Sequence, residues 1–99
     1  MSLFIDDMWT NDQKLIVVAV YGSGAELGKS CTVTVTVHDV GGQDRPLQPQ
    51  SGMVPVNGSE TLQVSFPDTP KTGKNHLVTA TATSETGVAS RPCKRRLDL

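Results

Sequence analysis

The sequence lacks the features by which a membrane span or a strongly charged partner would be recognised. Its longest uninterrupted apolar run, Leu15 to Tyr21, is far too short to cross a bilayer, so no membrane insertion is expected. The formal net charge is -1. Such a chain has no general attraction to phosphate backbones or anionic lipid, which makes nucleic acid a poor candidate partner.

Helical periodicity is also missing. Apolar residues nowhere recur at i, i+3, i+4 and i+7 over three turns, and one helical turn near Ala25 to Lys29 is the helical piece expected. The chain has 99 residues, a length that fits one domain spanning residues 1–99. We therefore predict a single all-β domain.

The start of the sequence predicts no secretion signal. A cationic start, an apolar stretch and a cleavage site are all absent. Residues 1–3 are compatible with a remnant of an expression vector that has replaced a leader. The missing signal therefore favours the cytoplasm only weakly.

Cysteine is scarce, and its two positions leave two alternatives open. Cys31 and Cys93 match no zinc-binding spacing. A disulfide between them would contribute about 4 kcal/mol in the chain-entropy model, and the alternative is two separate, half-buried thiols. Because an even cysteine count in a small β-domain is typical of exported proteins, we predict an extracellular, periplasmic or cell-surface location, with the cytoplasm as the alternative.

What the sequence does contain is strict alternation. From Ser30 to Asp39, cysteine and valine alternate with threonine and histidine, which predicts a strand with one buried and one solvated face. The dipeptide Asn57-Gly58 is typical of a tight hairpin turn, and two prolines make residues 43–50 an edge segment or a long loop. The run 15–21 is apolar on both parities, so both its faces should be covered. The expected strands are residues 4–10, 15–21, 30–39, 53–56, 60–66, 76–83 and 88–97.

About seven short strands separated by turn signals are typical of a β-sandwich. The segment KTGKNHLVTATATSETGVAS resembles the closing hairpin of bacterial immunoglobulin-like and fibronectin type III-like modules, and GSETLQVSFPDTP resembles the strand and loop before it. The resemblance implies an immunoglobulin-like β-sandwich of about seven antiparallel strands that acts as a spacer, adhesion or protein-binding unit. The sequence departs from that pattern in two places. His76 or Leu77 stands where a tyrosine often enters the penultimate strand, and Trp9 precedes both cysteines.

Threonine occupies the solvated positions of two expected strands. Neighbouring rows of threonine would form a flat array for a sugar or a crystal face. We assign these strands the second and sixth places of the immunoglobulin-like topology, which lie in opposite sheets, so the rows are expected on opposite outer faces. Threonine is then simply a good exposed strand residue. The rows are Thr32, Thr34 and Thr36, and Thr79, Thr81 and Thr83.

No catalytic or metal-binding pattern is present in the sequence. Neither His38 nor His76 is expected beside a cysteine, and the aspartates lack the spacing of a calcium loop. No nucleophile-elbow, zincin or phosphate-loop motif occurs. We therefore expect no catalytic residue, no metal and no cofactor. The basic cluster at residues 93–96 is expected to protect an edge strand from pairing.

Trp9 and Tyr21 are left as candidates for ligand contact. An exposed tryptophan would stack on a sugar or anchor a protein partner, but a core with so few large residues needs Trp9, Phe4 and Phe66 for volume. The predicted function is a non-catalytic structural or binding module whose partner is a protein or a neighbouring domain, with carbohydrate as the second ligand class. The alternatives are a small carbohydrate-binding domain and an intracellular assembly module of a phage or secretion apparatus.

Overall fold

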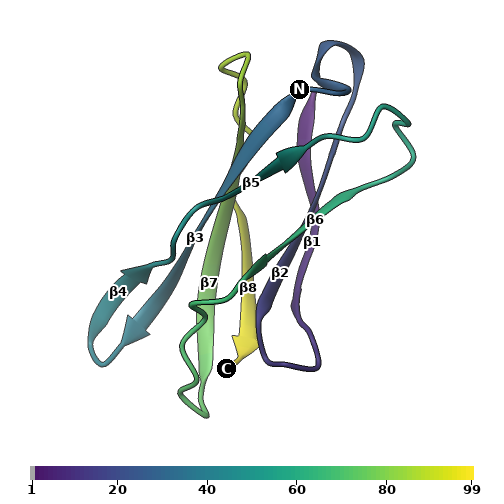
Figure 1. Cartoon of the computed structure of the whole chain (residues 1–99). Coiled ribbons are helices and arrows are strands. Elements are labelled where there is room, and N and C mark those ends of the chain that lie inside the picture. The colour runs from purple at the N-terminus through teal and green to yellow at the C-terminus, as the bar shows by residue number, and fades with distance from the viewer. Residues whose placement is uncertain (1) are drawn as a thin grey trace.

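The computed structural model describes residues 2–99 and shows an all-β chain of eight strands (Figure 1). A short 3₁₀ turn at Gly24–Glu26 overlaps the expected helical turn. In this part of the chain, no helix is long and apolar enough to cross a membrane. The strands are β1 (Leu3–Thr10), β2 (Ile16–Gly22), β3 (Ser30–Val40), β4 (Gln43–Pro46), β5 (Gln50–Met53), β6 (Leu62–Phe66), β7 (Asn75–Ser84) and β8 (Cys93–Asp98).

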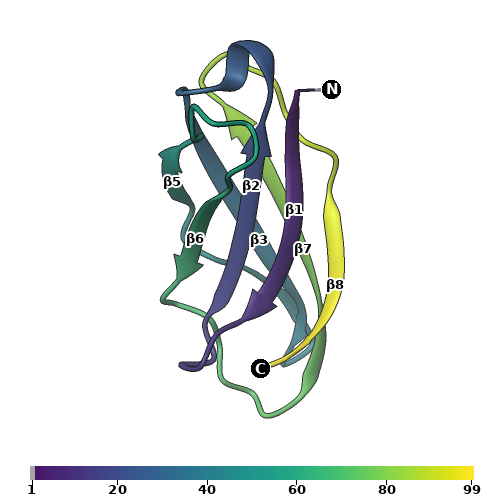
Figure 2. The same cartoon turned by 90° about the vertical axis from the view of Figure 1, so that its right-hand side faces the viewer.

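The strands form two antiparallel sheets that pack face to face, in the manner of a sandwich (Figure 2). One sheet has three strands in the order β1-β2-β6. The other has five, in the order β4-β3-β7-β8, with β5 pairing the remaining half of β3 on the side of β4. The all-β prediction is confirmed, and the proline-containing segment 43–50 supplies β4 as an edge strand.

The core between the sheets is built from the alternating positions that the sequence predicts. The inward side chains of β3 are at most 1% exposed, and those of β7 face the core in the same way. β2 is buried on both parities, as its uninterrupted apolar run predicts. The core residues of β3 and β7 are Cys31, Val33, Val35, Val37, Val78, Ala80 and Ala82.

A β-bulge in β1 decides which of its side chains reach the core. The register of β1 against β2 shifts between Ile5 and Asp7, so that Asp6 is an extra residue. One inserted residue reverses the parity of everything after it. Met8 therefore faces inward and is 2% exposed, while Trp9 lies on the outer side.

Three of the four aromatic residues lie outside the core: the bulge turns Trp9 outward, whereas Phe4 precedes the bulge and faces outward opposite Tyr21. Phe4 stacks on Tyr21 with ring centroids 4.9 Å apart, and Trp9 pairs with Val17 on the same outer side. All three aromatic side chains are only half-buried, whereas Phe66 is fully buried. The expectation that Trp9 and Phe4 fill the core is wrong.

Asn57 and Gly58 connect the two sheets instead of turning a hairpin. The strand before them, β5, pairs with β3, and the strand after them, β6, pairs with β2. Neither residue has the positive φ that a type I′ turn requires. Asn57 Oδ1 instead accepts hydrogen bonds from the N–H and the hydroxyl of Ser59 at 3.0 and 2.7 Å. This Asx turn supplies hydrogen bonds within the loop without strand pairing. The hairpin prediction is therefore wrong.

The closing hairpin of β7 and β8 is confirmed in its pairing. The two strands pair in register from Asn75 with Asp98 to Ala80 with Cys93. Before β8, a single bridge joins Thr83 to Ala89. The regular part of the last strand therefore begins later than residue 88.

The two terminal strands place the ends of the chain at opposite ends of the molecule. β1 begins at one end and β8 finishes at the other (Figures 1 and 2). The molecule measures 40 × 25 × 18 Å along its principal axes. The two ends of the chain are therefore separated along the long direction of the fold.

Candidate functional site

The outer face of the five-stranded sheet carries all six alternating threonines. At its centre Thr34 stands opposite Thr81, with one further threonine pair on each side. The expectation that the two rows lie on opposite faces is wrong, because β3 and β7 are neighbours in one sheet. We call this set the hydroxyl face: Thr32, Thr34, Thr36, Thr79, Thr81 and Thr83.

The hydroxyl face is polar. Thr32 Oγ1 lies 2.9 Å from Ser51 Oγ on β5, and Thr34 Oγ1 donates to the carbonyl oxygen of Thr81 at 3.4 Å. The six residues offer methyl groups and hydroxyls but no large apolar side chain. The face therefore lacks the desolvated anchor residues that carry most protein interfaces.

His38 links Asp44 to Thr79 at one end of this face. Its Nδ1 lies 3.1 Å from Asp44 Oδ1, and its Nε2 lies 2.8 Å from Thr79 Oγ1. The order acid, imidazole and hydroxyl is that of a nucleophilic triad. A triad also needs free N–H donors for an oxyanion, but β7 is paired on both sides, so its ladders occupy the backbone groups around Thr79. We interpret the three residues as a link that orients β3, β4 and β7.

His76 holds the same end of β7 through both ring nitrogens. It is 5% exposed, its Nδ1 donates to the carbonyl oxygen of His38 at 3.0 Å, and its Nε2 lies 2.6 Å from Thr72 Oγ1. Leu97 stands opposite His76 on β8, so Cys93 is not its neighbour. Among residues 2–99, no group of three or more histidine, cysteine or acidic side chains is placed to hold a metal ion.

β8 is the free edge of the five-stranded sheet and carries three consecutive cations. The register with β7 places Lys94 and Arg96 on the side of the hydroxyl face. Arg95 lies on the other side, and its Nη2 is 3.2 Å from Asp7 Oδ1 on β1. Within the described chain, neither Lys94 nor Arg96 has a carboxylate within ion-pair distance. The sequence predicts that this basic cluster protects an edge strand from pairing, and the strand that carries it is an edge strand. We call Lys94, Arg95 and Arg96 the basic edge.

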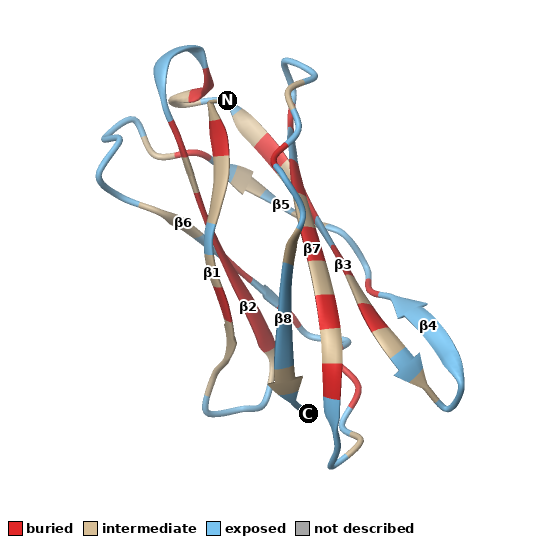
Figure 3. Ribbon diagram, turned by 180° about the vertical axis from the view of Figure 1, so that it is seen from behind, coloured by how far each residue is buried: buried red, intermediate tan, exposed pale blue. Residues whose placement is uncertain are grey.

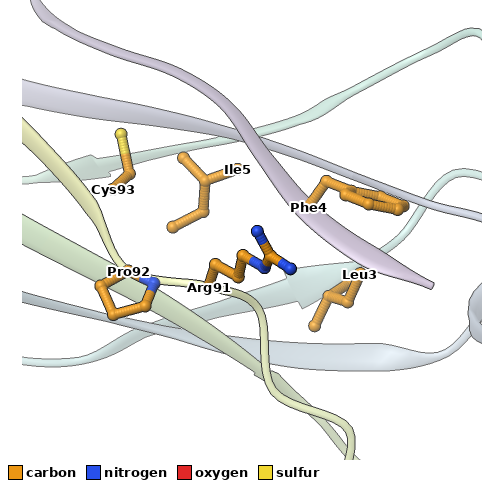
Figure 4. Close-up of a pocket in the computed structure, with 6 residues that line it drawn as sticks. All are labelled: Leu3, Phe4, Ile5, Arg91, Pro92 and Cys93. Carbon is orange, nitrogen blue, oxygen red and sulfur yellow. The ribbon is translucent and has the colours of Figure 1, made fainter. Parts of the chain in front are cut away.

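A groove of about 440 Å³ lies between β1 and the segment that leads into β8 (Figure 4). Its walls are mostly apolar, and the side chain of Arg91 is its one charged group. The groove ends beside Cys93, the first residue of β8, so apolar surface adjoins the basic edge. The lining residues are Leu3, Phe4, Ile5, Arg91, Pro92 and Cys93.

The two aromatic candidates lie on the same sheet but are not brought together. Trp9 lines a shallow hollow at the turn between β1 and β2, and Tyr21 lines another beside Gly58. Trp9 pairs with Val17, which lies four residues before Tyr21 on β2, or about 13 Å along the strand. Each aromatic side chain is therefore accessible singly and not as part of one platform.

The two cysteines are free thiols. Cys31 stands opposite Ser84 and Cys93 opposite Ala80, so β7 lies between them. Two strand spacings and four residues along β7 put their Cα atoms about 16 Å apart. A bridge requires roughly 4.4–6.8 Å. Of the two alternatives, the structure shows separate thiols, and a Cys31–Cys93 bridge is incompatible with this register.

Cys31 lies near a buried carboxylate that the sequence does not reveal. Glu26 is 1% exposed and accepts hydrogen bonds from the Thr86 hydroxyl at 2.7 and 2.9 Å and from the Ser84 hydroxyl at 3.2 Å. Burial raises the pKa of the Cys31 thiol, and the charge of Glu26 raises this pKa further. A thiol with a raised pKa is a poor nucleophile, so Cys31 is structural.

Comparison of the chain with protein-family models, with curated proteins and with solved structures finds no match in any of the three.

Proposed function

We propose that this chain is a non-catalytic structural and binding module of the immunoglobulin-like, fibronectin type III-like class. The observation that carries the proposal is the placement of the chain ends at opposite ends of a molecule 40 Å long. Modules joined through such ends would follow one another in a line, and each would keep its sheet faces and strand edges accessible. This geometry suits a spacer that also binds a protein.

The strand order supports the family assignment. β1, β2 and β6 take the places of strands A, B and E, while β3, β7 and β8 take those of C, F and G. In a constant-type immunoglobulin domain the fourth strand joins the first sheet beside E. Here β4 and β5 pair with β3 in the other sheet. This difference favours the fibronectin type III-like form.

An exported location belongs to the proposal and depends on the family resemblance. The cysteines give it no further support, since they stand in separate positions of one sheet. An intracellular assembly module of a phage or secretion apparatus is the alternative location for the same binding role.

A tandem of two copies, with the last residue of one joined to the first of the next, tests the spacer role. Small-angle scattering should give a longest dimension of about twice the 40 Å of one copy. A second tandem with a long Gly/Ser linker controls for linker geometry, because such a linker behaves as a flexible coil. A directly joined tandem that packs side by side would contradict the proposal.

A small carbohydrate-binding domain is a second candidate, and the position of Trp9 favours it. The bulge in β1 turns this side chain outward, where its indole ring would stack on a sugar. Titration with soluble oligosaccharides should then shift the fluorescence of Trp9, the single tryptophan of the chain. Loss of binding in W9A but not in Y21A, measured by calorimetry because W9A has no tryptophan, would assign the sugar to the hollow at the β1–β2 turn. Fluorescence unchanged across the oligosaccharides rejects this candidate.

A further inference from the structure

The outward side of β8 is an unpaired strand edge. β8 pairs with β7 on one side only, and within residues 2–99 the other backbone bonds at this end join Leu99 to Gly73 and Lys74. The pairing of β8 with β7 has no register shift. Figure 3 shows β8 exposed over most of its length beside the alternating β7. A regular, exposed edge presents N–H and C=O groups on which another strand can form a ladder.

The other edges of the two sheets are blunted. β1 carries the bulge at Asp6, and β4 contains Pro46 and a register shift in its pairing with β3. β5 and β6 have only four and five residues, and they lie against each other at one corner of the sandwich, as β1 and β8 do at the other. Bulges, prolines and short strands are common protections against strand addition, and β8, with six residues in regular register, has none of these three. β8 is therefore the edge best formed to accept a strand.

The charges of β8 determine which kind of strand can pair with its free edge. Lys94 and Arg96 lie two residues apart on the same side of the strand. Where β8 strands of two copies overlapped at these positions, cations would face cations, and like charges directly opposite are destabilising. The single carboxylate of β8, Asp98, already accepts a hydrogen bond from Asn75 Nδ2 at 2.9 Å. A strand with carboxylates at every second position would face Lys94 and Arg96 favourably.

The other side of an added strand would meet apolar surface. Cys93 and Leu97 are half-buried and lie on the core side of β8, and the apolar groove adjoins Cys93. Arg95, between them, is already paired with Asp7. Because successive side chains of a strand point to opposite sides, the residues between the carboxylates would face this surface. Aliphatic side chains fit it best.

We propose that β8 binds an extended acidic segment of a partner protein as an additional strand of the five-stranded sheet. The segment alternates carboxylate and aliphatic side chains. Its carboxylates lie beside Lys94 and Arg96 at the border of the hydroxyl face, and its aliphatic side chains lie beside Leu97 and the groove. Main-chain hydrogen bonds provide affinity and the side chains provide specificity. The inference rests on the proposed function, since it names the partner class of that binding module.

Fluorescence anisotropy with the labelled, end-blocked peptide EVEIEVET tests the proposal on the intact chain. We expect saturable binding that weakens by about tenfold in K94E/R96E, because two favourable charge pairs become like-charge pairs. The peptide KVKIKVKT should show the reverse preference and bind K94E/R96E more tightly than the unchanged chain. Such a charge exchange places the peptide beside these two residues.

The matched control is K29E/R45E, which makes the same change in net charge away from β8. Lys29 precedes β3, and Arg45 lies on β4 at the far edge of the sheet. Its affinity for EVEIEVET should stay within about twofold of the unchanged chain, because distant exposed charges contribute little. An equal loss in both variants would mean general charge attraction and would overturn the proposal. The milder K94Q/R96Q replaces K94E/R96E if circular dichroism shows that the latter is unfolded.

Backbone methylation separates strand addition from charge attraction. Two versions of EVEIEVET, N-methylated at alternate residues of opposite parity, direct their methyl groups either toward β8 or away from it. One version should lose binding and the other should keep it. Equal affinity of the two versions overturns the proposal, as does equally tight binding of the non-alternating isomer EEEEVIVT.

Sedimentation of the unchanged chain tests a second copy as the occupant. A dimer that depends on concentration and excludes EVEIEVET would assign β8 to self-association and overturn the proposal. The tandem scattering experiment is independent of this edge. An extended tandem that binds no peptide rejects the β8 inference alone, whereas a side-by-side tandem that binds EVEIEVET rejects the spacer role alone.

Discussion

The hydroxyl of Thr69 joins the first residue of β2, Ile16, to the last residue of β6. Thr69 Oγ1 accepts a hydrogen bond from the N–H of Ile16 at 3.0 Å and donates to the carbonyl oxygen of Phe66 at 2.6 Å. Ile16 and Phe66 are register partners, and Thr69 is 6% exposed. One side chain therefore closes the end of the β2–β6 ladder and satisfies two buried backbone groups.

Replacing Thr69 by valine should destabilise the fold by about 1–3 kcal/mol, because the N–H of Ile16 stays buried without an acceptor. T69S keeps the hydroxyl and should lose much less. The free energy of unfolding from urea titration measures both variants. A T69S variant less stable than T69V would show that the methyl group, and not the hydrogen bonds, holds this corner.

Glu26 gives a second stability prediction. Its carboxylate is the acceptor for the hydroxyls of Ser84 and Thr86, so E26A should cost about 1.5–3 kcal/mol, the usual range for hydrogen bonds to a charged group. E26Q keeps one acceptor oxygen and should fall between E26A and the unchanged chain. Urea unfolding monitored by circular dichroism ranks the three. An E26A variant as stable as the unchanged chain would contradict the buried cluster.

The two thiols should differ in reactivity. Intact mass after alkylation in denaturant without reductant should show two added groups, since no bridge joins the cysteines. Under native conditions Cys93 should react first, because Cys31 is buried and its raised pKa leaves less thiolate at a given pH. C93S leaves a slow reaction at Cys31, and C31S leaves a fast one. Faster labelling of Cys31 than of Cys93 would be the contrary result.

The same pKa shift links stability to alkaline pH. The folded-state pKa of Cys31 is raised above that of the unfolded chain, so its contribution is fully present below the unfolded pKa. The free energy of unfolding should therefore fall as the pH rises from the unfolded thiol pKa toward the folded one. C31A removes the thiol and should flatten this part of the profile. An identical slope in C31A would assign the alkaline loss to other groups.

Trp9 should report its outward position in its emission. The side chain is half-buried on the outer side of β1, so acrylamide should quench the native protein at a substantial fraction of the rate for the unfolded chain. Unfolding should shift the emission to longer wavelength by a modest amount only. A blue emission that resists acrylamide would mean that Trp9 packs in the core and that the bulge is absent.

The strands of this fold are predictable because alternation is local. β3, β6 and β7 each show period-2 burial within a single run of residues. No single run of residues specifies which strands become neighbours in a sheet. The threonine rows of β3 and β7 therefore came out in one sheet against expectation, and Asn57-Gly58 joins two sheets although its residues suit a hairpin.

The prediction that Trp9 lies in the core failed for a different reason. Volume alone placed Trp9 in the core, but one inserted residue between Ile5 and Asp7 reverses the parity of the strand. The adjacent carboxylates of Asp6 and Asp7 were a usable signal, since regular alternation would have turned one of them toward the core. The burial of Glu26 had no such signal, because a polar residue in a loop is normally solvated.

The placement of the chain ends also fixes how the molecule would carry tension. A pull between the two ends would run nearly parallel to β1 and β8, while antiparallel ladder bonds lie across the strands. The bonds of β1 with β2 and of β8 with β7 would share the load together instead of opening one at a time. The module would thus behave as a stiff link, and a partner held along the side of β8 would travel with it under load.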